Sequence, residues 1–271
     1  MGRIIAVANQ KGGVGKTTTS VNLSASLAAT RRRVLLIDLD PQGNATMGSG
    51  VDKHGMALTG CEVLLGEAGL DEAIVEAREA GFDLLGANAD LTAAEVSLMT
   101  MPQSEKRLQQ ALEHVSHRYD YILVDCPPSL NMLTVNALVA ARGVIIPMQC
   151  EYYALEGLSA LLDTIEKIRT TLNFQLGIEG ILRTMFDSRN RLANEVSNQL
   201  LSHFGDKVYN TIVPRNVRLA EAPSYGLPVM LYDKHSQGAR AYLALAGEIL
   251  RRDQRKEGQG ETGQAGERDP M

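Results

Sequence analysis

The sequence predicts an α/β protein: a doubly wound, mainly parallel β-sheet with helices on both faces. Short apolar segments without polar alternation recur along the chain, as is usual for parallel strands that are buried on both faces. Segments with helical spacing of apolar residues lie between them, and polar loops follow several of these strands. A length of 271 residues favours one large domain over two.

The first half of the chain begins with a strand, a glycine-rich loop and a helix. Residues 3–9 (RIIAVAN) are an apolar run that ends at the loop, and residues 17–29 follow with helical spacing. A second buried strand is expected over 33–40 (RVLLIDLD), which leads into a loop rich in turn-forming residues. Residues 57–118 are mostly helical in pattern, with a short strand expected at 82–87.

The alternation continues to the end of the folded part. Expected helices cover 104–118, 135–143, 154–172 and 236–252, and expected strands cover 119–125, 144–149, 181–186 and 208–213. The segment after residue 252 has almost no apolar side chains, so burial cannot offset the entropy lost on ordering it. We therefore predict one domain over 1–252 and a disordered hydrophilic tail over 253–271.

Composition favours a cytoplasmic protein and excludes several classes. The chain is 44% hydrophobic and 22% charged, and it contains no apolar run long enough to span a bilayer. Its first ten residues, MGRIIAVANQ, lack the features of a signal peptide. The three cysteines, Cys61, Cys126 and Cys150, form no C-x-x-C pair, and we interpret them as small buried hydrophobes rather than metal ligands.

Charge is unevenly distributed along the chain. The formal net charge is −5, yet residues 183–252 contain ten Lys or Arg and only six acids. This asymmetry permits a local basic face on an acidic protein.

The stretch AVANQKGGVGKTTTSVNL, at residues 6–23, contains a phosphate-binding loop with an irregularity. The pattern G-x-x-x-x-G-K-[ST] is matched by Gly15, Lys16 and Thr17, but Gln10 stands where its first glycine belongs, and a second cation, Lys11, follows. Glycines leave the backbone N–H groups open to phosphate, and the next helix adds its dipole. Lys16 is suited to the β- and γ-phosphates, and the Thr17 hydroxyl to Mg²⁺.

Three aspartates follow predicted strands. Asp125 ends the apolar run YILVD, which is the Walker B arrangement for a Mg²⁺ site. Asp38 and Asp40 stand two apart in LIDLDPQGN, so an extended backbone points both the same way. One is suited to orienting the attacking water and the other to supporting the metal. A turn or helix-cap role remains the alternative for each.

Five segments together resemble the ParA/Soj family of chromosome- and plasmid-partitioning ATPases, which have a deviant Walker A motif. They are NQKGGVGKTTT, LLIDLDPQGNAT, YDYILVDCPPSL, PMQCEYYALEGL and VYNTIVPRNVRLAEAPSYGLP. The similarity covers residues 3–250 and is close to the chromosomal Soj branch. It implies a P-loop ATPase domain over 1–252, with ATP or ADP and Mg²⁺ as cofactors.

The resemblance also implies roles for individual residues. Lys11 would reach across an ATP-sandwich homodimer to the partner's phosphates, and Gly12 would lie at the close subunit contact. Asp40 would position the hydrolytic water, so that Lys11, Lys16 and Asp40 are the catalytic set. The implied metal set is Thr17, Asp38 and Asp125. The implied nucleotide contacts are Lys11, Gly12, Gly13, Val14, Gly15, Lys16, Thr17, Thr18, Asp40, Met185, Pro214 and Asn216.

The family's ATP-bound dimers bind double-stranded DNA without sequence preference. Arg189 and Arg218 match positions of the family's basic face; Arg215, Lys234 and Arg240 are further candidates, for which a solvated surface role is an equal alternative. The resemblance implies a nucleoid-associated protein without membrane binding. A ParB/Spo0J-type centromere-binding partner would stimulate its slow hydrolysis.

Three other functions compete with this interpretation. A MinD-like membrane ATPase needs a basic amphipathic C-terminal helix, whereas residues 253–271 hold five acids and three Lys or Arg. A nitrogenase-reductase-like electron carrier needs cysteines from each subunit to hold an Fe–S cluster, and the three scattered cysteines disfavour it. Cys126 does, however, lie beside the Walker B strand. An ATP-gated DNA-binding regulator of replication or sporulation would turn over little ATP, against which the aspartates Asp38, Asp40 and Asp125 argue.

Overall fold

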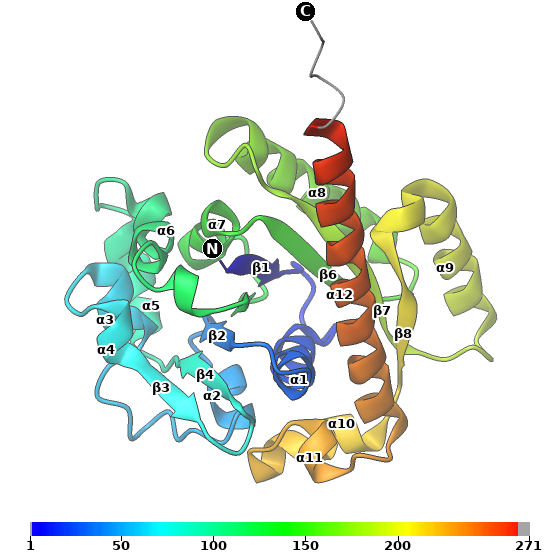
Figure 1. Cartoon of the computed structure of the whole chain (residues 1–271), viewed down its shortest axis with the longest axis horizontal. Helices are drawn as coiled ribbons and strands as arrows, with labels where there is room; N and C mark the ends of the chain where they lie inside the picture. The colour runs from blue at the N-terminus through cyan, green and yellow to red at the C-terminus, as the bar shows by residue number, and fades with distance from the viewer. Residues whose placement is uncertain (1, 265–271) are drawn as a thin grey trace, which may run out of the picture.

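A computed structural model describes residues 2–264 and contains one eight-stranded sheet over that range (Figure 1). The strand order is β3-β4-β2-β5-β1-β6-β7-β8, and every neighbouring pair is parallel except β3 and β4. The strands are β1 (Arg3–Val7), β2 (Val34–Asp38), β3 (Ile74–Ala77), β4 (Phe82–Leu85), β5 (Tyr121–Asp125), β6 (Gly143–Gln149), β7 (Gly177–Phe186) and β8 (Val208–Pro214). The predicted doubly wound, mainly parallel sheet is confirmed.

Helices cover both faces of the sheet. The α-helices are α1 (Lys16–Ala29), α2 (Asn44–Gly48), α3 (Gly60–Leu65), α4 (Leu70–Ala73), α5 (Leu91–Leu98), α6 (Arg107–Leu112), α7 (Met132–Ala140), α8 (Ala154–Thr171), α9 (Arg191–Phe204), α10 (Val217–Glu221), α11 (Val229–Tyr232) and α12 (Gln237–Gln264). Alternate residues of β1 enter two separate cores: Ile4 and Ala6 face one, and Ile5 and Val7 face the other. This two-sided burial explains why the strands read as continuous apolar runs.

The strand order brings the polar loops to one edge of the sheet. Strand β5 lies between β1 and β2, so that Asp125 is in register with both Val7 and Asp38. The phosphate-loop segment follows β1 directly. Its glycines and two of the predicted carboxyls therefore meet at the carboxyl ends of the strands, where open α/β sheets bind ligands.

Some elements differ from the sequence prediction. The edge strand β3 and helix α9 had no expected counterpart. The helix expected at 104–118 is broken into α6 and two flanking 3₁₀ turns. The Asn136 side chain explains one end of this break, because its Oδ1 accepts from the backbone N–H of Leu108 at 3.1 Å and its Nδ2 donates to the Ser104 carbonyl at 2.8 Å.

Helix α12 continues into the segment predicted to be disordered. It reaches Gln264, and Asp253 accepts a hydrogen bond from the Tyr121 hydroxyl at 2.5 Å and pairs with Arg3. The structure therefore differs from the expected tail over 253–264, where the helix continues from turns that are already packed, despite three glycines in this segment. Residues 265–271 lie outside the described residues.

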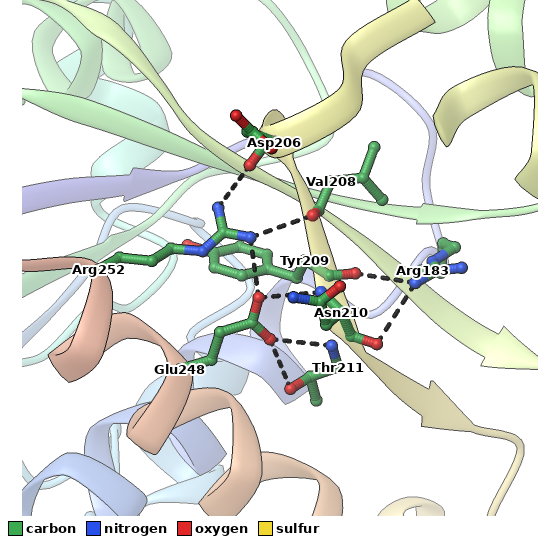
Figure 2. A network of polar contacts seen from close by, with 8 residues as sticks. All are labelled: Arg183, Asp206, Val208, Tyr209, Asn210, Thr211, Glu248 and Arg252. Carbon is green, nitrogen blue, oxygen red and sulfur yellow. Dashed lines mark hydrogen bonds and ion pairs between the residues drawn. The ribbon is translucent and has the colours of Figure 1, made fainter. Parts of the chain in front are cut away.

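Side chains of α12 also close the exposed edge of the sheet at β8 (Figure 2). Glu248 accepts from the backbone N–H groups of Asn210 and Thr211, each at 2.9 Å. Arg252 donates to the carbonyls of Asp206 and Val208, at 2.9 and 3.0 Å. Groups that would otherwise be open to another strand are thereby satisfied within the chain.

Candidate nucleotide site

A cavity of about 520 Å³ opens at the carboxyl ends of the central strands, a size typical of small-molecule sites. Ten of the twelve predicted nucleotide contacts line it: Gly12, Gly13, Gly15, Lys16, Thr17, Thr18, Asp40, Met185, Pro214 and Asn216. The other two do not. Val14 is buried, with 1% of its surface exposed, and Lys11 points elsewhere.

The loop presents backbone N–H groups to the cavity. Gly13 and Gly15 have φ of 71° and 88°, a left-handed conformation that favours glycine. Gly15 is the N-cap of α1, no side chain caps that terminus, and the first turn has no acidic residue. The first N–H groups of α1 are therefore available to an anion.

The irregular start of the loop has a local explanation. Asn9 Oδ1 accepts from the backbone N–H of Lys11 at 3.0 Å, which forms an Asx turn across Gln10, and Asn9 Nδ2 donates to the Pro147 carbonyl at 2.8 Å. Gln10 is not among the residues with positive φ. The turn therefore needs no glycine at position 10, because the Asn9 side chain supplies its hydrogen bond.

Lys16 is buried at the base of the loop, with 7% of its surface exposed. Its Nζ lies 3.3 Å from the carbonyl oxygen of Lys11. Burial lowers the pKa of the Lys16 ammonium, and the nearby Asp125 carboxylate opposes that shift. A phosphate group would add a counter-charge where Lys16 has only partial compensation.

Thr17 and Asp125 form a hydroxyl–carboxylate pair suited to a hard cation. Thr17 Oγ1 donates to Asp125 Oδ2 at 2.8 Å, and Ser20 Oγ donates to Asp125 Oδ1 at 2.7 Å. Burial, followed by the neighbouring Asp38, raises the pKa of Asp125 to about 7. Oxygen ligands of this kind fit Mg²⁺, and a cation there would restore the charged carboxylate. Ser20, one turn after Thr17, was not predicted.

Asp38 lies behind the cavity wall, whereas its predicted metal role would place it in the cavity. It is fully buried and does not line the cavity. Its Oδ2 accepts from both the backbone N–H and the hydroxyl of Thr46 at 2.8 Å, and its Oδ1 accepts from the backbone N–H of Asp40 at 3.1 Å. Asp38 therefore holds the loop that carries Asp40, and its place in a metal shell stays a prediction.

Asp40 reaches the cavity from the loop after β2. Its Oδ1 accepts from the backbone N–H of Gln42 at 3.0 Å, and its carbonyl accepts from Gly43 at 2.8 Å. The turn leaves the other carboxylate oxygen without a bonding partner in the described part of the chain. An oxygen placed in this way is suited to accepting a hydrogen bond from water.

Lys11 turns away from the cavity of its own chain. Its Nζ lies 2.5 Å from Glu151 Oε2 in the loop between β6 and α8, and both side chains are a little under half exposed. An exposed pair of this kind is weak, so a stronger anion can displace Glu151. The Lys11 ammonium therefore lies outside the nucleotide cavity of its own chain, where a ligand or another molecule could reach it.

Gly12 is not constrained by its own chain. A Cβ built at Gly12 meets no atom within 4 Å. Any need for glycine at this position therefore comes from a ligand or a second molecule.

The far wall of the cavity is formed by β7 and the segment after β8. Met185 has φ of 48°, a conformation that is strained for a residue with a long side chain. Thr184 Oγ1 donates to the Val14 carbonyl at 2.8 Å and so ties β7 to the phosphate loop. Val213, Leu219 and Tyr242 add apolar surface that sequence reasoning missed.

The predicted DNA-binding cations differ in their surroundings. Arg189 forms a two-bond ion pair with Asp187, and Arg218 pairs with Glu221 at 2.8 Å and Asp233 at 3.3 Å. Arg215, Lys234 and Arg240 make no ion pair within the described residues, and Arg215 lines the cavity. Arg215 also lies close enough to Asp187 to act on the carboxylate that pairs with Arg189, and Arg218 pairs with the neighbour of Lys234.

Comparisons with known proteins agree with this geometry. A family model described as an AAA domain matches residues 2–178. The chain is 50% identical to the chromosome partitioning protein ParA of Caulobacter vibrioides, over 93% of this chain and 95% of that one. It is 52% identical to the sporulation initiation inhibitor protein Soj of Bacillus subtilis, over 92% and 98% of the two chains.

The crystal structure of a cobyrinic acid a,c-diamide synthase from Mycobacterium smegmatis, with a bound ATP analogue and magnesium, is also similar. Its TM-score is 0.81 and its identity 38%, over 93% of this chain and 95% of that one. A phosphate loop on β1, a Walker B carboxyl on β5 and full-length identity near 50% lead to one conclusion. The chain belongs to the ParA/Soj family of chromosome-partitioning ATPases.

Proposed function

We propose that this chain is a Mg²⁺-dependent ATP switch that closes into a homodimer, binds double-stranded DNA without sequence preference, and takes part in DNA segregation. A ParB/Spo0J-type partner stimulates its slow hydrolysis, which returns the dimer to monomers that leave the nucleoid. The observation that carries the proposal is the pair of lysines that follow β1. Lys16 lies at the base of the cavity, whereas Lys11 lies outside it.

The chemistry of the cavity supports the nucleotide and the metal. The open N–H groups of α1 and the Lys16 ammonium would hold the phosphates, and Thr17 and Asp125 would hold Mg²⁺. The metal would neutralise charge on the phosphates. Asp40 would orient the attacking water from its turn after β2.

The two lysine positions support a dimer that depends on ATP. A cation that another subunit supplies stabilises transition-state charge much as an arginine finger does. Lys11 is exposed and only weakly paired, and Gly12 beside it has open space around it. The ADP-bound site would offer such a lysine less negative charge, so hydrolysis would weaken the dimer.

Unpaired surface cations support contact with DNA phosphates. Arg215, Lys234 and Arg240 have no ion pair with another side chain of residues 2–255. Arg189 and Arg218 would have to exchange exposed acidic partners for phosphate. Each contact of this type is weak alone. Dimerisation doubles the number of contacts and raises the affinity.

One experiment tests dimerisation and DNA binding together. Binding to a random-sequence duplex is measured across a salt series with ATP, ADP or no nucleotide, each with Mg²⁺, and the mass of the free protein is measured in parallel. We expect a dimer and tight, salt-sensitive binding only with ATP. The switch is wrong if binding is equally tight with ATP and with ADP.

A further inference from the structure

The edge of the sheet opposite the nucleotide cavity carries a second hollow. It has a volume of about 540 Å³ and lies at the amino ends of β1, β2, β5 and β6. Four arginines from three segments line it: Arg3 on β1, Arg32 and Arg33 before β2, and Arg142 before β6. The parallel sheet gathers them, because the amino ends of its strands share one edge.

A neighbouring hollow continues this basic surface across α12. It has a volume of about 520 Å³ and is lined by Arg251, Arg252 and Arg255. Leu250 and Asp253 of the same helix line the first hollow, so the turns of α12 around residues 247–255 lie between the two. We call the seven arginines around both hollows the amino-edge surface.

Among residues 2–255, three carboxylates line the same two hollows: Asp120, Asp253 and Glu248. The chain as a whole has a formal net charge of −5. The amino-edge surface is therefore a concentrated excess of positive charge on an acidic protein, and it lies mostly outside the basic span noticed in the sequence.

Part of this charge is fixed by bonds within the fold. Arg3 pairs with Glu179 and Asp253, and Arg33 pairs with Asp120 at 3.1 Å. Arg252 pairs with Glu248 at 2.8 Å and lies over the Tyr209 ring. These three hold the local structure.

The other four arginines are available for a ligand. Arg32, Arg142, Arg251 and Arg255 are exposed and make no ion pair with another side chain of residues 2–255. They lie on both sides of a helix that is about 10–12 Å wide with its side chains. Cations spread over that width match an extended polyanion better than one small anion. Guanidinium groups pair well with phosphate oxygens.

We propose that the amino-edge surface is a second DNA-binding surface, which holds the phosphate backbone of duplex DNA. The proposal rests on the proposed function for DNA as the ligand, and it adds a site at the opposite edge of the sheet. Arg215 lines the nucleotide cavity, and α12 runs from that cavity, at Tyr242, to the amino-edge surface, at Asp253 (Figure 1). A dimer therefore has basic surfaces at both edges and holds two DNA segments at once.

The variant Arg32→Glu/Arg142→Glu tests the surface without touching an ion pair or the nucleotide site. Arg78→Glu/Lys167→Glu is the control, with the same charge change at exposed positions elsewhere. It also breaks the exposed pair of Arg78 with Glu76, which contributes little to stability. Affinity for a random-sequence duplex is measured with ATP and Mg²⁺ across a salt series, and DNA-free ATP hydrolysis shows that each variant is folded.

The test variant is expected to bind about tenfold more weakly at 0.1 M salt, and its log–log salt slope to be shallower by about 2, because each lost phosphate contact removes about 0.9. The control is expected to bind close to wild type, and ATP hydrolysis to stay unchanged in both. Should the glutamates prevent folding, Arg32→Gln/Arg142→Gln is used, with a smaller change in the same direction.

A bridging measurement separates the two edges. One duplex is immobilised and capture of a second, labelled duplex is recorded. We expect wild type and the control to capture it, and Arg32→Glu/Arg142→Glu to lose capture. If that variant binds and bridges as the control does, the amino-edge surface is not a DNA site and the proposed function stands. If wild type binds no DNA in any nucleotide state, the proposed function fails, and this inference fails with it.

Discussion

Asp125 and Asp38 are fully buried carboxyls in register on adjacent strands, which places two potential negative charges together. Burial raises the pKa of Asp125 to about 7 and that of Asp38 to about 6. In an unfolded chain both would titrate near 3.9. Between these values the folded protein binds more protons than the unfolded chain, so its stability falls as the pH rises.

This linkage predicts that Asp125→Asn stabilises the nucleotide-free protein at pH 8, by about 1–3 kcal/mol, because it removes a buried charge. The gain should shrink as the pH falls to 5, where wild-type Asp125 is protonated. Urea unfolding at the two pH values measures both. A gain that is equal at pH 5 and pH 8 would contradict the assignment. The same variant should lose ATP hydrolysis, since it removes the carboxylate proposed for Mg²⁺.

Glu151 is the one acidic partner of Lys11 in the described structure, and it lies outside the cavity. Because the pair is exposed, Glu151→Gln should change the free energy of unfolding by less than about 1 kcal/mol. It should free Lys11 for a second subunit and tighten ATP-dependent dimerisation by up to about fivefold. Sedimentation equilibrium with ATP measures this, and Glu156→Gln on the adjacent helix is the control. Weaker dimerisation would mean that Glu151 itself contacts the partner.

The side-chain contacts that α12 makes with the edge strand β8 should contribute strongly to the free energy of unfolding. Glu248 is buried, and it satisfies two backbone N–H groups and Arg252. Glu248→Ala leaves the two N–H groups without an acceptor and removes the acidic partner of Arg252, which keeps its bonds to the Asp206 and Val208 carbonyls. The change should lower the free energy of unfolding by about 3–5 kcal/mol. Glu248→Gln keeps one acceptor and should cost less. Urea unfolding compares them, and equal losses would show that packing rather than hydrogen bonding holds α12 against β8.

Strong periodicity made most of the fold predictable. The buried strands and long helices were recovered because an apolar run or a helical stripe records burial directly. β3 was missed because it is a four-residue edge strand, of which only Ala77 is buried. The break near residue 104 depends on Asn136, which is distant in sequence, and no local pattern contains that information.

Site residues that belong to a sequence motif could be predicted. Site residues that only the folded chain brings together could not. The glycines, Lys16 and Thr17 follow from the loop pattern. Ser20 bonds to Asp125 because the fold packs α1 beside the end of β5, and Thr46 bonds to Asp38 because α2 follows the turn after β2. The partner of Lys11 lies 140 positions away. The extension of α12 past residue 252 was not expected, because the composition of a segment does not show whether a packed helix precedes it.

As a whole, the molecule has hollows at both edges of its sheet, the nucleotide cavity and the amino-edge surface, and α12 contributes to both. Hydrolysis should control only the edge that carries Asp40. We predict that Asp40→Ala keeps ATP bound and accumulates as a DNA-bound dimer, whereas Lys16→Ala fails to bind ATP and stays monomeric. Nucleotide binding, light scattering and ATPase rates on the two variants check this. Hydrolysis at the wild-type rate by Asp40→Ala would remove Asp40 from the catalytic set.

The space around Gly12 suggests how this position should behave in measurements of stability and of function. Since a methyl group there meets no atom of the same chain, Gly12→Ala should melt at the wild-type temperature and pass any screen for soluble, folded protein. Its defect would emerge only when a nucleotide enters the cavity or two copies try to close. A substitution at such a position should leave the melting temperature unchanged but reduce inheritance of DNA in a genetic selection. Positions that affect inheritance without affecting stability would therefore identify the residues of the proposed dimer interface.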